Sequence, residues 1–327
     1  MAGVAVASLG FGFGASAKPT YTTFDPSGSV YTDAERIDAG IIAGQYKDSA
    51  DMFHGYVRAA DGTITSFDPP GSAYTFPWAI FAGAIVGIYE DSSGVYHGFL
   101  RAPDGTVTEF DPSGSIGTYA RGINKGGAIA GYYQDSSDVL HGFVRAADGT
   151  FATFDPSGSV DTTTWAINNR GTATGYYLDS SFEAHGFVRA ANGTITEFDA
   201  TGCIQTWPFA INRSGAITGW CESENLTYVG FVREPDGTST SFVAPNADSY
   251  TVGYGIDNRG TVTGLYEDSS NIRHGFVRKP DGLIKDFDVP GSAQSYGRSI
   301  DSSQMPHAIA GNYVDNNGVQ HGYLRTR

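Results

Sequence analysis

The chain has 327 residues, of which 35 are acidic and 20 are basic, so its formal net charge is −15. A negative charge of this size repels phosphate backbones and anionic membrane surfaces at long range, which excludes nucleic acid as an expected partner. The 44 glycines, the abundant Tyr and Phe, and a charged fraction of only 17% favour tight turns and half-buried strands over disorder or a helical fold.

A stretch of small and apolar residues opens the chain. It runs from Val4 to Ala17 and ends in an Ala-x-Ala-like cleavage site before Lys18, a pattern typical of a signal peptide. The basic residues that normally precede such a stretch are missing, and the alternative is a disordered apolar tail. We expect residues 1–17 to be a signal peptide or its remnant, residues 18–327 to be one domain, and the protein to be secreted or periplasmic. No later stretch reaches the 18 or so apolar residues of a membrane span, so no membrane insertion is expected.

One pattern recurs seven times along the rest of the chain. Its clearest mark is a His-Gly pair, at His54, His97, His141, His185, His274 and His321, with Val229-Gly230 in the remaining copy. The copies are 43 to 47 residues apart. Short apolar runs and Gly-rich turns with this period are typical of β-propeller blades rather than of helical solenoids. The sequence therefore predicts an all-β fold, a single seven-bladed β-propeller.

The third copy illustrates the four antiparallel strands expected in each blade. Strands are predicted over 119–124, 128–134, 139–146 and 150–154. Gly149 occupies the hairpin position that needs a positive φ. Strand directions then place the loops between blades and the Asp-Ser-Ser turns on one face, and the Asn-x-x-Gly and Asp-Gly turns on the other.

The two ends of the repeat region complement each other. Residues 21–24 match the last strand of a repeat, whereas the final copy stops after its His321-Gly322 strand and lacks a last strand. We expect the N-terminal strand to complete the last blade and close the ring, because closure removes an open sheet edge.

Four motifs of the third copy carry a resemblance to a known family. They are Gly122-Ile123-Asn124-Lys125-Gly126-Gly127, Gly131-Tyr132-Tyr133-Gln134-Asp135, His141-Gly142-Phe143-Val144-Arg145, and Asp148-Gly149 through Phe154-Asp155-Pro156. The pattern resembles the HAF-repeat family of exported bacterial proteins, and the resemblance covers nearly all of residues 18–327. The fifth copy departs most, with Trp220-Cys221-Glu222-Ser223-Glu224 and Val229 in place of the usual residues. The resemblance implies architecture and export, and it implies no particular reaction.

The recurrent side chains are expected to have structural roles. Equivalent positions of successive blades are spread around a ring, so the histidines cannot converge on one metal ion, and we expect each to join a hydrogen-bond network within its blade. The turn aspartates Asp48, Asp91, Asp135, Asp179, Asp268 and Asp315 suit Asx turns better than a calcium site, which needs six to eight oxygens. No cofactor or metal is expected. Two further sets are expected to form the core between blades: Phe24, Phe67, Phe110, Phe154, Phe198, Phe242 and Phe287, and Ile37, Ile80, Ile123, Ile167, Ile211, Ile256 and Ile300.

A function that the molecule performs once should depend on positions where the copies differ. Two such positions precede the recurrent Ile. Two residues before it stand Glu35, Trp78, Arg121, Trp165, Phe209, Tyr254 and Arg298, and four residues before it stand Asp33, Phe76, Tyr119, Thr163, Trp207, Val252 and Tyr296. Because side chains alternate along a strand, both positions should face the same way, toward the mouth of the central channel.

Eleven of these side chains are candidate ligand-binding residues: Glu35, Phe76, Trp78, Tyr119, Arg121, Trp165, Trp207, Phe209, Tyr254, Tyr296 and Arg298. Aromatic planes beside Arg and Glu suit a small polar ligand with apolar faces, such as a sugar. The alternative is that the large aromatic side chains only pack between blades.

Cys203 and Cys221 are the two cysteines of the chain. In register with the other copies they fall on the same face of the fifth blade. Together with the expected export, this favours a disulfide bond over a metal ligand or a catalytic thiol.

No linear signature of a hydrolase, metalloprotease or nucleotide-binding protein is present. We therefore favour an exported, non-catalytic binding protein, a monomer that recognises carbohydrate or a cell-surface glycan. One alternative is a propeller hydrolase or lyase acting on a polysaccharide or a small lactone, with Glu35, Arg121 and Arg298 as acid-base and anion-binding residues. Another is a purely structural extracellular adhesion module.

Overall fold

The computed structural model describes residues 18–303 and 307–326. Within these residues all regular secondary structure is β-strand, 28 strands in total. The predicted signal peptide, residues 1–17, lies outside the described residues. A search of the described part for a helix long and apolar enough to cross a membrane finds none.

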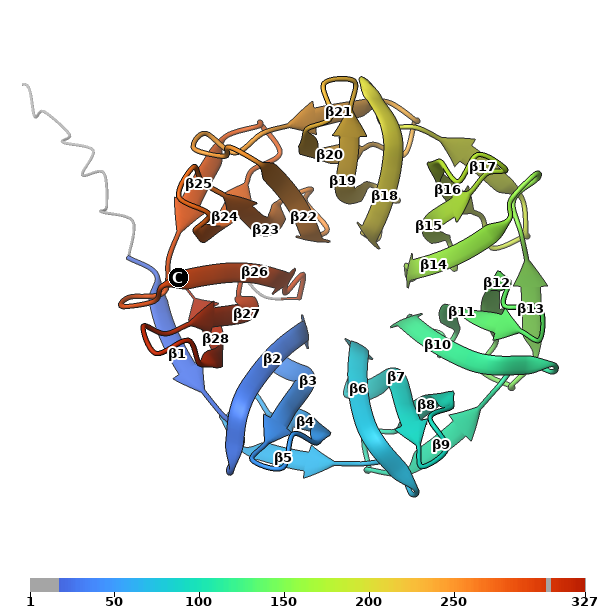
Figure 1. Ribbon diagram of the computed structural model, residues 1–327, viewed down its shortest axis with the longest axis horizontal. Helices are drawn as coiled ribbons and strands as arrows, with labels where there is room; N and C mark the ends of the chain where they lie inside the picture. Colours follow the sequence, from blue (N-terminus) through green and yellow to red (C-terminus); the bar gives the residue numbers. More distant parts are fainter. Residues whose placement is uncertain (1–17, 304–306, 327) are drawn as a thin grey trace, which may run out of the picture.

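The strands form antiparallel groups of four. Five are separate four-stranded sheets, and two more, β18–β21 and β22–β25, are joined into an eight-stranded sheet by a single parallel pair, Tyr228 with Tyr250. Twenty-eight strands are thus consistent with seven groups of four. We number these groups as sheets 1 to 7 after their first strands. Figure 1 shows the sheets arranged around a common axis, with each first strand nearest to it.

The four strands of a sheet run outward from the axis. The first strands are β2 (Ser29–Asp38), β6 (Ser72–Phe81), β10 (Ser115–Ile123), β14 (Asp161–Ile167), β18 (Cys203–Ile211), β22 (Tyr250–Ile256) and β26 (Gln294–Ile300). The second strands are β3 (Ile41–Asp48), β7 (Ala84–Asp91), β11 (Ile129–Asp135), β15 (Ala173–Leu178), β19 (Ile217–Ser223), β23 (Val262–Glu267) and β27 (Ile309–Val314).

The third strands carry the His-Gly pairs or their replacement. They are β4 (Phe53–Arg58), β8 (Tyr96–Arg101), β12 (Leu140–Arg145), β16 (Ala184–Arg189), β20 (Tyr228–Arg233), β24 (Arg273–Arg278) and β28 (Gln320–Thr326). The outer strands are β5 (Ile64–Phe67), β9 (Val107–Phe110), β13 (Phe151–Phe154), β17 (Ile195–Phe198), β21 (Ser239–Phe242), β25 (Ile284–Phe287) and β1 (Thr20–Phe24).

The N-terminal strand pairs with the last strand of the chain. β1 is antiparallel to β28, with Thr20 opposite Thr326 and Phe24 opposite Gly322. The first strands contact one another in chain order, and β26 also contacts β2. The predicted completion of the last sheet by residues 21–24 is therefore present in the strand pairing.

The third copy matches its predicted strands except at the first. β10 begins at Ser115, four residues before the predicted start, because residues 115–118 already pair with β11 across an irregularity between Ser115 and Gly117. Ser115 lies opposite Asp135, so the loop between sheets and the Asp-Ser-Ser turn share one face, as predicted.

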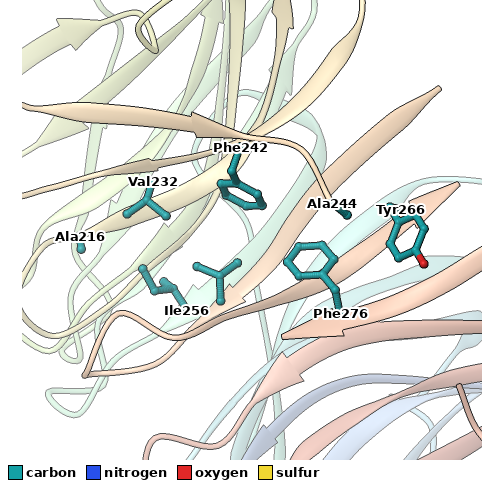
Figure 2. Packing of buried hydrophobic residues seen from close by; sticks show 8 residues of the cluster. Ala216, Val232, Phe242, Ala244, Ile256, Tyr266 and Phe276 are labelled. Atoms are coloured by element: carbon teal, nitrogen blue, oxygen red, sulfur yellow. The ribbon is translucent and has the colours of Figure 1, made fainter. Parts of the chain in front are cut away.

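The recurrent Phe residues form the core between neighbouring sheets, as expected. Phe110 packs edge-on against Phe143 of the next sheet, and Arg145 of that sheet lies over the Phe110 ring at 4.9 Å. The same Phe–Arg contact recurs at every sheet junction. Figure 2 shows the junction of sheets 5 and 6, where Phe242 packs with Ile256 and Phe276.

The His residue of the third copy belongs to a network within its own sheet. His141 Nδ1 lies 2.7 Å from Asp155 Oδ2, and Nε2 lies 3.5 Å from Asp135 Oδ2. Asp135 Oδ1 accepts hydrogen bonds from the backbone amides of Ser137 and Val139, which is the predicted Asx turn. The histidine side chain is 24% exposed, so this network sits at the surface and not in the interior.

Cys203 and Cys221 form a disulfide bond with a Cα–Cα distance of 5.9 Å. The bond links β18 to β19 within sheet 5. The predicted disulfide is confirmed, and neither sulfur is available as a free thiol.

Candidate functional site

A β-bulge interrupts the first strand of every sheet at the same place. In β10, Ala120 pairs with Gly131 and Gly122 pairs with Ala130, which leaves Arg121 without an opposite residue. A bulge bends its strand and redirects the side chain of the extra residue. The seven extra residues are Glu35, Trp78, Arg121, Trp165, Phe209, Tyr254 and Arg298, the variable position two before the recurrent Ile.

The bulge explains a glycine in every second strand. A Cβ atom added to Gly131 would overlap the carbonyl oxygen of Tyr119, which the bulge presses against β11. The same overlap with a first-strand carbonyl would occur at Gly44, Gly87, Gly175, Gly219, Gly264 and Gly311. The glycine that recurs in every second strand therefore leaves room for the bulge, and the bulge carries the residue that varies from sheet to sheet.

The seven bulge residues, together with Arg36, line one cavity at the axis with a volume of about 300 Å³. We call it the mouth cavity. The recurrent Ile residues, predicted only as core, also line the next segment of the channel while packing into the sheets. Beyond them the channel reaches the turns at Asn168, Asn169 and Asn258 on the other face. The mouth cavity thus lies toward the face of the inter-sheet loops.

Stacked side chains make up one side of the mouth cavity. The Arg121 guanidinium carbon lies 3.3 Å from the ring centroid of Trp78 and 4.2 Å from that of Trp165. Trp165 packs on Phe209 at 5.0 Å between centroids, and Phe209 stacks on Tyr254 with an angle of 7° between the rings. Half-buried aromatic rings held in this way are preorganised surfaces for a ligand with apolar faces.

The opposite side is charged. Asp33 is only 4% exposed, and it accepts hydrogen bonds from Gln45, Tyr31 and Asn312. Gln45 also donates to Glu35 Oε1 at 3.3 Å. Arg298 Nε lies 4.0 Å from Asp33 Oδ1, and its side chain keeps 25% exposure because it faces the channel.

Burial and the neighbouring Glu35 carboxylate raise the pKa of Asp33 to about 7. Burial acts in the same direction on Glu35, but the guanidinium groups of Arg298 and Arg36 outweigh it and hold the pKa of Glu35 below its usual value. The two carboxyl groups therefore differ in their affinity for a proton, and Glu35 is the member that loses its proton at the lower pH.

Four of the predicted ligand-binding residues do not line the mouth cavity. Tyr119 stacks on Tyr132 at 4.7 Å, and Trp207 stacks on Trp220 at 4.1 Å. Phe76 packs on Phe53 of the preceding sheet, and Tyr296 donates a hydrogen bond to Gln294. All four residues stand four positions before the recurrent Ile. The bulge lies between that position and the lining residue two positions later, so the simple alternation of side chains expected along the strand does not hold across it. A ligand contact at these residues stays a prediction.

Arg36 is a lining residue that was not among the predicted candidates. Arg36 stands one residue before the recurrent Ile, and the other six copies have only Ala, Gly or Ser at that position. Burial and the positive charges of Arg298 and Arg121 lower the pKa of Arg36, against the opposing effect of Glu35. A single large charged residue in a column of small ones was the signal that could have found it.

Among the described residues, two groups of side chains bring three potential metal ligands together: His97 with Glu109 and Asp111, and Asp179 with Glu183 and His185. Both belong to the repeated His–Asp network on the outer part of the sheets. Exposed pairs of this kind form without a metal, and the carboxylate–His contacts recur in copies with no third ligand.

Comparison with solved structures gives many matches of the same architecture. The β-propeller domain of the Trilobed protease from Pyrococcus furiosus, described as having an open velcro topology, matches with a TM-score of 0.62 at 7% identity, over 90% of this chain and 95% of that one. TolB from Acinetobacter baumannii matches with a TM-score of 0.50 at 10% identity, over 88% and 79% of the two chains. The fold is that of a β-propeller.

Some of the similar propellers occur within enzymes. A puromycin-hydrolyzing peptidase of Mycobacterium tuberculosis matches with a TM-score of 0.60 at 11% identity, over 93% of this chain but 55% of that one. At these identities the likeness concerns the fold alone. No protein-family model matches the sequence, and no curated protein is similar to it.

Proposed function

We propose that this chain is an exported seven-bladed propeller, closed by its N-terminal strand and related to the HAF-repeat proteins, that binds carbohydrate at the mouth cavity without catalysis. The observation that carries the proposal is the convergence of the seven bulge residues on one cavity. The sheets are otherwise alike, and at this cavity they present different side chains. Residues of five different types, brought together from all seven sheets, have the character of a binding site and not of a repeated structural element.

The chemistry of the lining supports a saccharide. Trp165, Phe209 and Tyr254 offer aromatic surface for the apolar face of a sugar ring, while Glu35 and the arginines offer partners for its hydroxyl groups. The cavity volume of about 300 Å³ is at the small end of ligand pockets, which suits one terminal sugar unit better than an extended chain. Export is supported by the Cys203–Cys221 disulfide, since such bonds persist in oxidising compartments.

A glycan array with residues 18–327, followed by titration calorimetry on the best ligand, tests the proposal. Trp78→Ala and Trp165→Ala should each weaken binding by about 1 to 3 kcal/mol, the range for loss of an aromatic stacking partner. Trp220→Ala is the matched control, because Trp220 stacks on Trp207 and does not line the mouth cavity. If the Trp78 and Trp165 variants bind normally but melt at far lower temperature, the lining is core packing and the proposal fails.

The carboxyl pair favours a second candidate, a hydrolase or lyase. Glu35 lines the cavity, and the buried Asp33 lies behind it with a different proton affinity, both close to Arg298, an arrangement that suits general acid-base chemistry. Incubation of a bound glycan with the protein separates the candidates. Product formation that Glu35→Gln abolishes would favour the enzyme, whereas recovery of the intact ligand favours the binding protein.

A further inference from the structure

Arg121 differs from the arginines stacked at the sheet junctions in what its polar edge faces. Five of the outer arginines, Arg145 among them, donate Nη1 to the carbonyl oxygen of the next residue and lie at sheet junctions. Arg121 is held between Trp78 and Trp165, and it donates Nη2 to the Tyr132 hydroxyl at 3.0 Å. Its guanidinium lines the mouth cavity. The two indoles fix its faces and leave its edge for a ligand.

No carboxylate neutralises Arg121 within the described residues, in contrast to Arg298 beside Asp33. The Nε of Arg121 is buried without a hydrogen-bond partner, a property it shares with the outer stacked arginines except Arg325. The indole Nε1 of Trp165, which also lines the mouth cavity, is buried and unpartnered too. Both nitrogen atoms are covered by protein, so contact with a ligand falls to the remaining guanidinium edge of Arg121, which is the complement of a carboxylate.

The charges of the lining point the same way. The mouth cavity is lined by three arginines, Arg36, Arg121 and Arg298, and by one acidic residue, Glu35. The whole chain has a net charge of −15, so the cavity has the opposite sign to the protein around it. Long-range repulsion disfavours a polyanion, while the local field favours a ligand that carries a single negative charge.

We propose that the mouth cavity binds an acidic sugar, with the carboxylate of one uronic-acid unit held by Arg121 and Arg36 and the sugar ring against the neighbouring aromatic side chains. This inference rests on the proposed carbohydrate binding and names the class of sugar. Arg36 is suited to the second contact because it lines the same cavity and its Nη1 is held by the Glu35 carbonyl oxygen at 3.1 Å.

Titration calorimetry with methyl β-glucuronide and methyl β-galacturonide, each against the matching neutral glucoside and galactoside, tests the carboxylate directly. The two members of a pair differ only at C6. We expect the acidic member to bind at least tenfold more tightly, and Arg121→Gln to weaken the acidic member by a much larger factor than the neutral one, so that most of the preference is lost. Sodium acetate, titrated as a carboxylate without a sugar, should bind far more weakly than the glucuronide.

Two further variants keep the result interpretable. Arg121→Lys preserves the charge but loses the planar, stacked group, so it should retain part of the preference even where Arg121→Gln alters the melting temperature. Arg170→Gln removes an exposed arginine outside the mouth cavity and should change nothing.

Each alternative outcome is decisive. Equal binding of acidic and neutral sugars, unaffected by Arg121→Gln, overturns the acidic preference and leaves carbohydrate binding standing. Acetate binding as tight as the glucuronide overturns the role of the sugar ring. Failure of all four glycosides, with no hit on a glycan array, overturns the proposed function and this inference together.

Discussion

Arg145 and Arg121 are the same residue type, both stacked on aromatic rings, in two different regions of the molecule. Arg145 lies over Phe110 at a sheet junction, and six equivalent arginines repeat that contact. Arg121 lies between two tryptophans at the axis, a contact that no other sheet repeats among the residues that the structure describes. The same interaction is therefore part of the framework where it repeats, and part of a candidate site where it occurs once.

The comparison separates a repeated outer framework, made of the third and fourth strands and their junctions, from the variable mouth cavity. Changes in the framework should act on stability, and changes at the cavity should act on binding. Four experiments test that division.

The largest effect should follow from deletion of residues 18–26. This removes β1, which pairs with β28, and Phe24, whose ring packs against Tyr56 and under Arg58. Phe24 is partly buried, so its loss costs part of the about 3 to 5 kcal/mol typical of a buried Phe, and the deletion also exposes a sheet edge; we therefore expect a large loss of stability or aggregation. Thermal and denaturant unfolding measure it. A shortened chain that melts like the full one would show that β28 does not need its partner.

The second-largest effect on stability should come from the second-strand glycine that packs against the bulge. Gly131→Ala should cost about 3 kcal/mol or more, because the new Cβ overlaps the Tyr119 carbonyl oxygen and forces the bulge to move. Gly117→Ala is the control, since its Cβ would meet only side-chain atoms of Tyr119 at ordinary contact distance. Equal melting temperatures for the two variants would contradict the role assigned to the second-strand glycine.

Replacement of both cysteines by serine should cost roughly 3 kcal/mol, because the Cys203–Cys221 bond closes a loop with a sequence separation of 18 residues. Denaturant unfolding of the double variant measures the loss, and sugar binding should be unchanged. Thiol titration of the unreduced, denatured wild-type protein should find no free sulfhydryl. Two titratable thiols would rule out the bond in the isolated protein.

The smallest effect should be a pH dependence of the outer framework. Burial opposes protonation of His54, His97, His141 and His274, but the paired carboxylates outweigh it and raise the pKa of each. A pKa raised in the folded state stabilises at low pH: the contribution is full below the unfolded value of about 6.5 and is lost as the pH rises through the higher folded value.

Unfolding midpoints measured between pH 5 and 9, in the range set by the ordinary His value of about 6.5, should therefore fall modestly toward alkaline pH. His141→Asn should flatten part of this slope. The effect is small because these side chains are partly exposed and screened. A slope of the opposite sign would mean that the His–Asp pairs are not charged in the folded state.

Much of the fold could be predicted from the sequence because the same pattern of residues recurs in every copy. The His-Gly pairs gave the period, the turn residues separated the strands, and residues 21–24 identified the missing outer strand. Strand boundaries at β10 were less visible, since Gly117 reads as the end of a loop although its backbone continues the strand.

The candidate site was predicted in part. The variable column two before the recurrent Ile does line one cavity, and the column four before it does not. A bulge leaves no mark in the alternation of residue types, so the sequence could not show that Arg121 and Tyr119 point to different surroundings. The one sign of the bulge in the sequence is the glycine found in every second strand, such as Gly131. From the sequence alone this glycine looks like an ordinary turn or strand residue, because its contact with a first-strand carbonyl oxygen is visible only in the structure.

At each bulge one residue accommodates the backbone and another supplies the side chain in the cavity, and this separation has a practical consequence for protein engineering. The backbone of each bulge is accommodated by a glycine on the neighbouring strand, so its geometry does not depend on which side chain the bulge residue carries. Glu, Trp, Arg, Phe and Tyr all occupy the position already. The molecule therefore has seven positions around one cavity that can each be mutated to other residues. A combinatorial library at these positions should yield receptors of new selectivity on an unchanged scaffold.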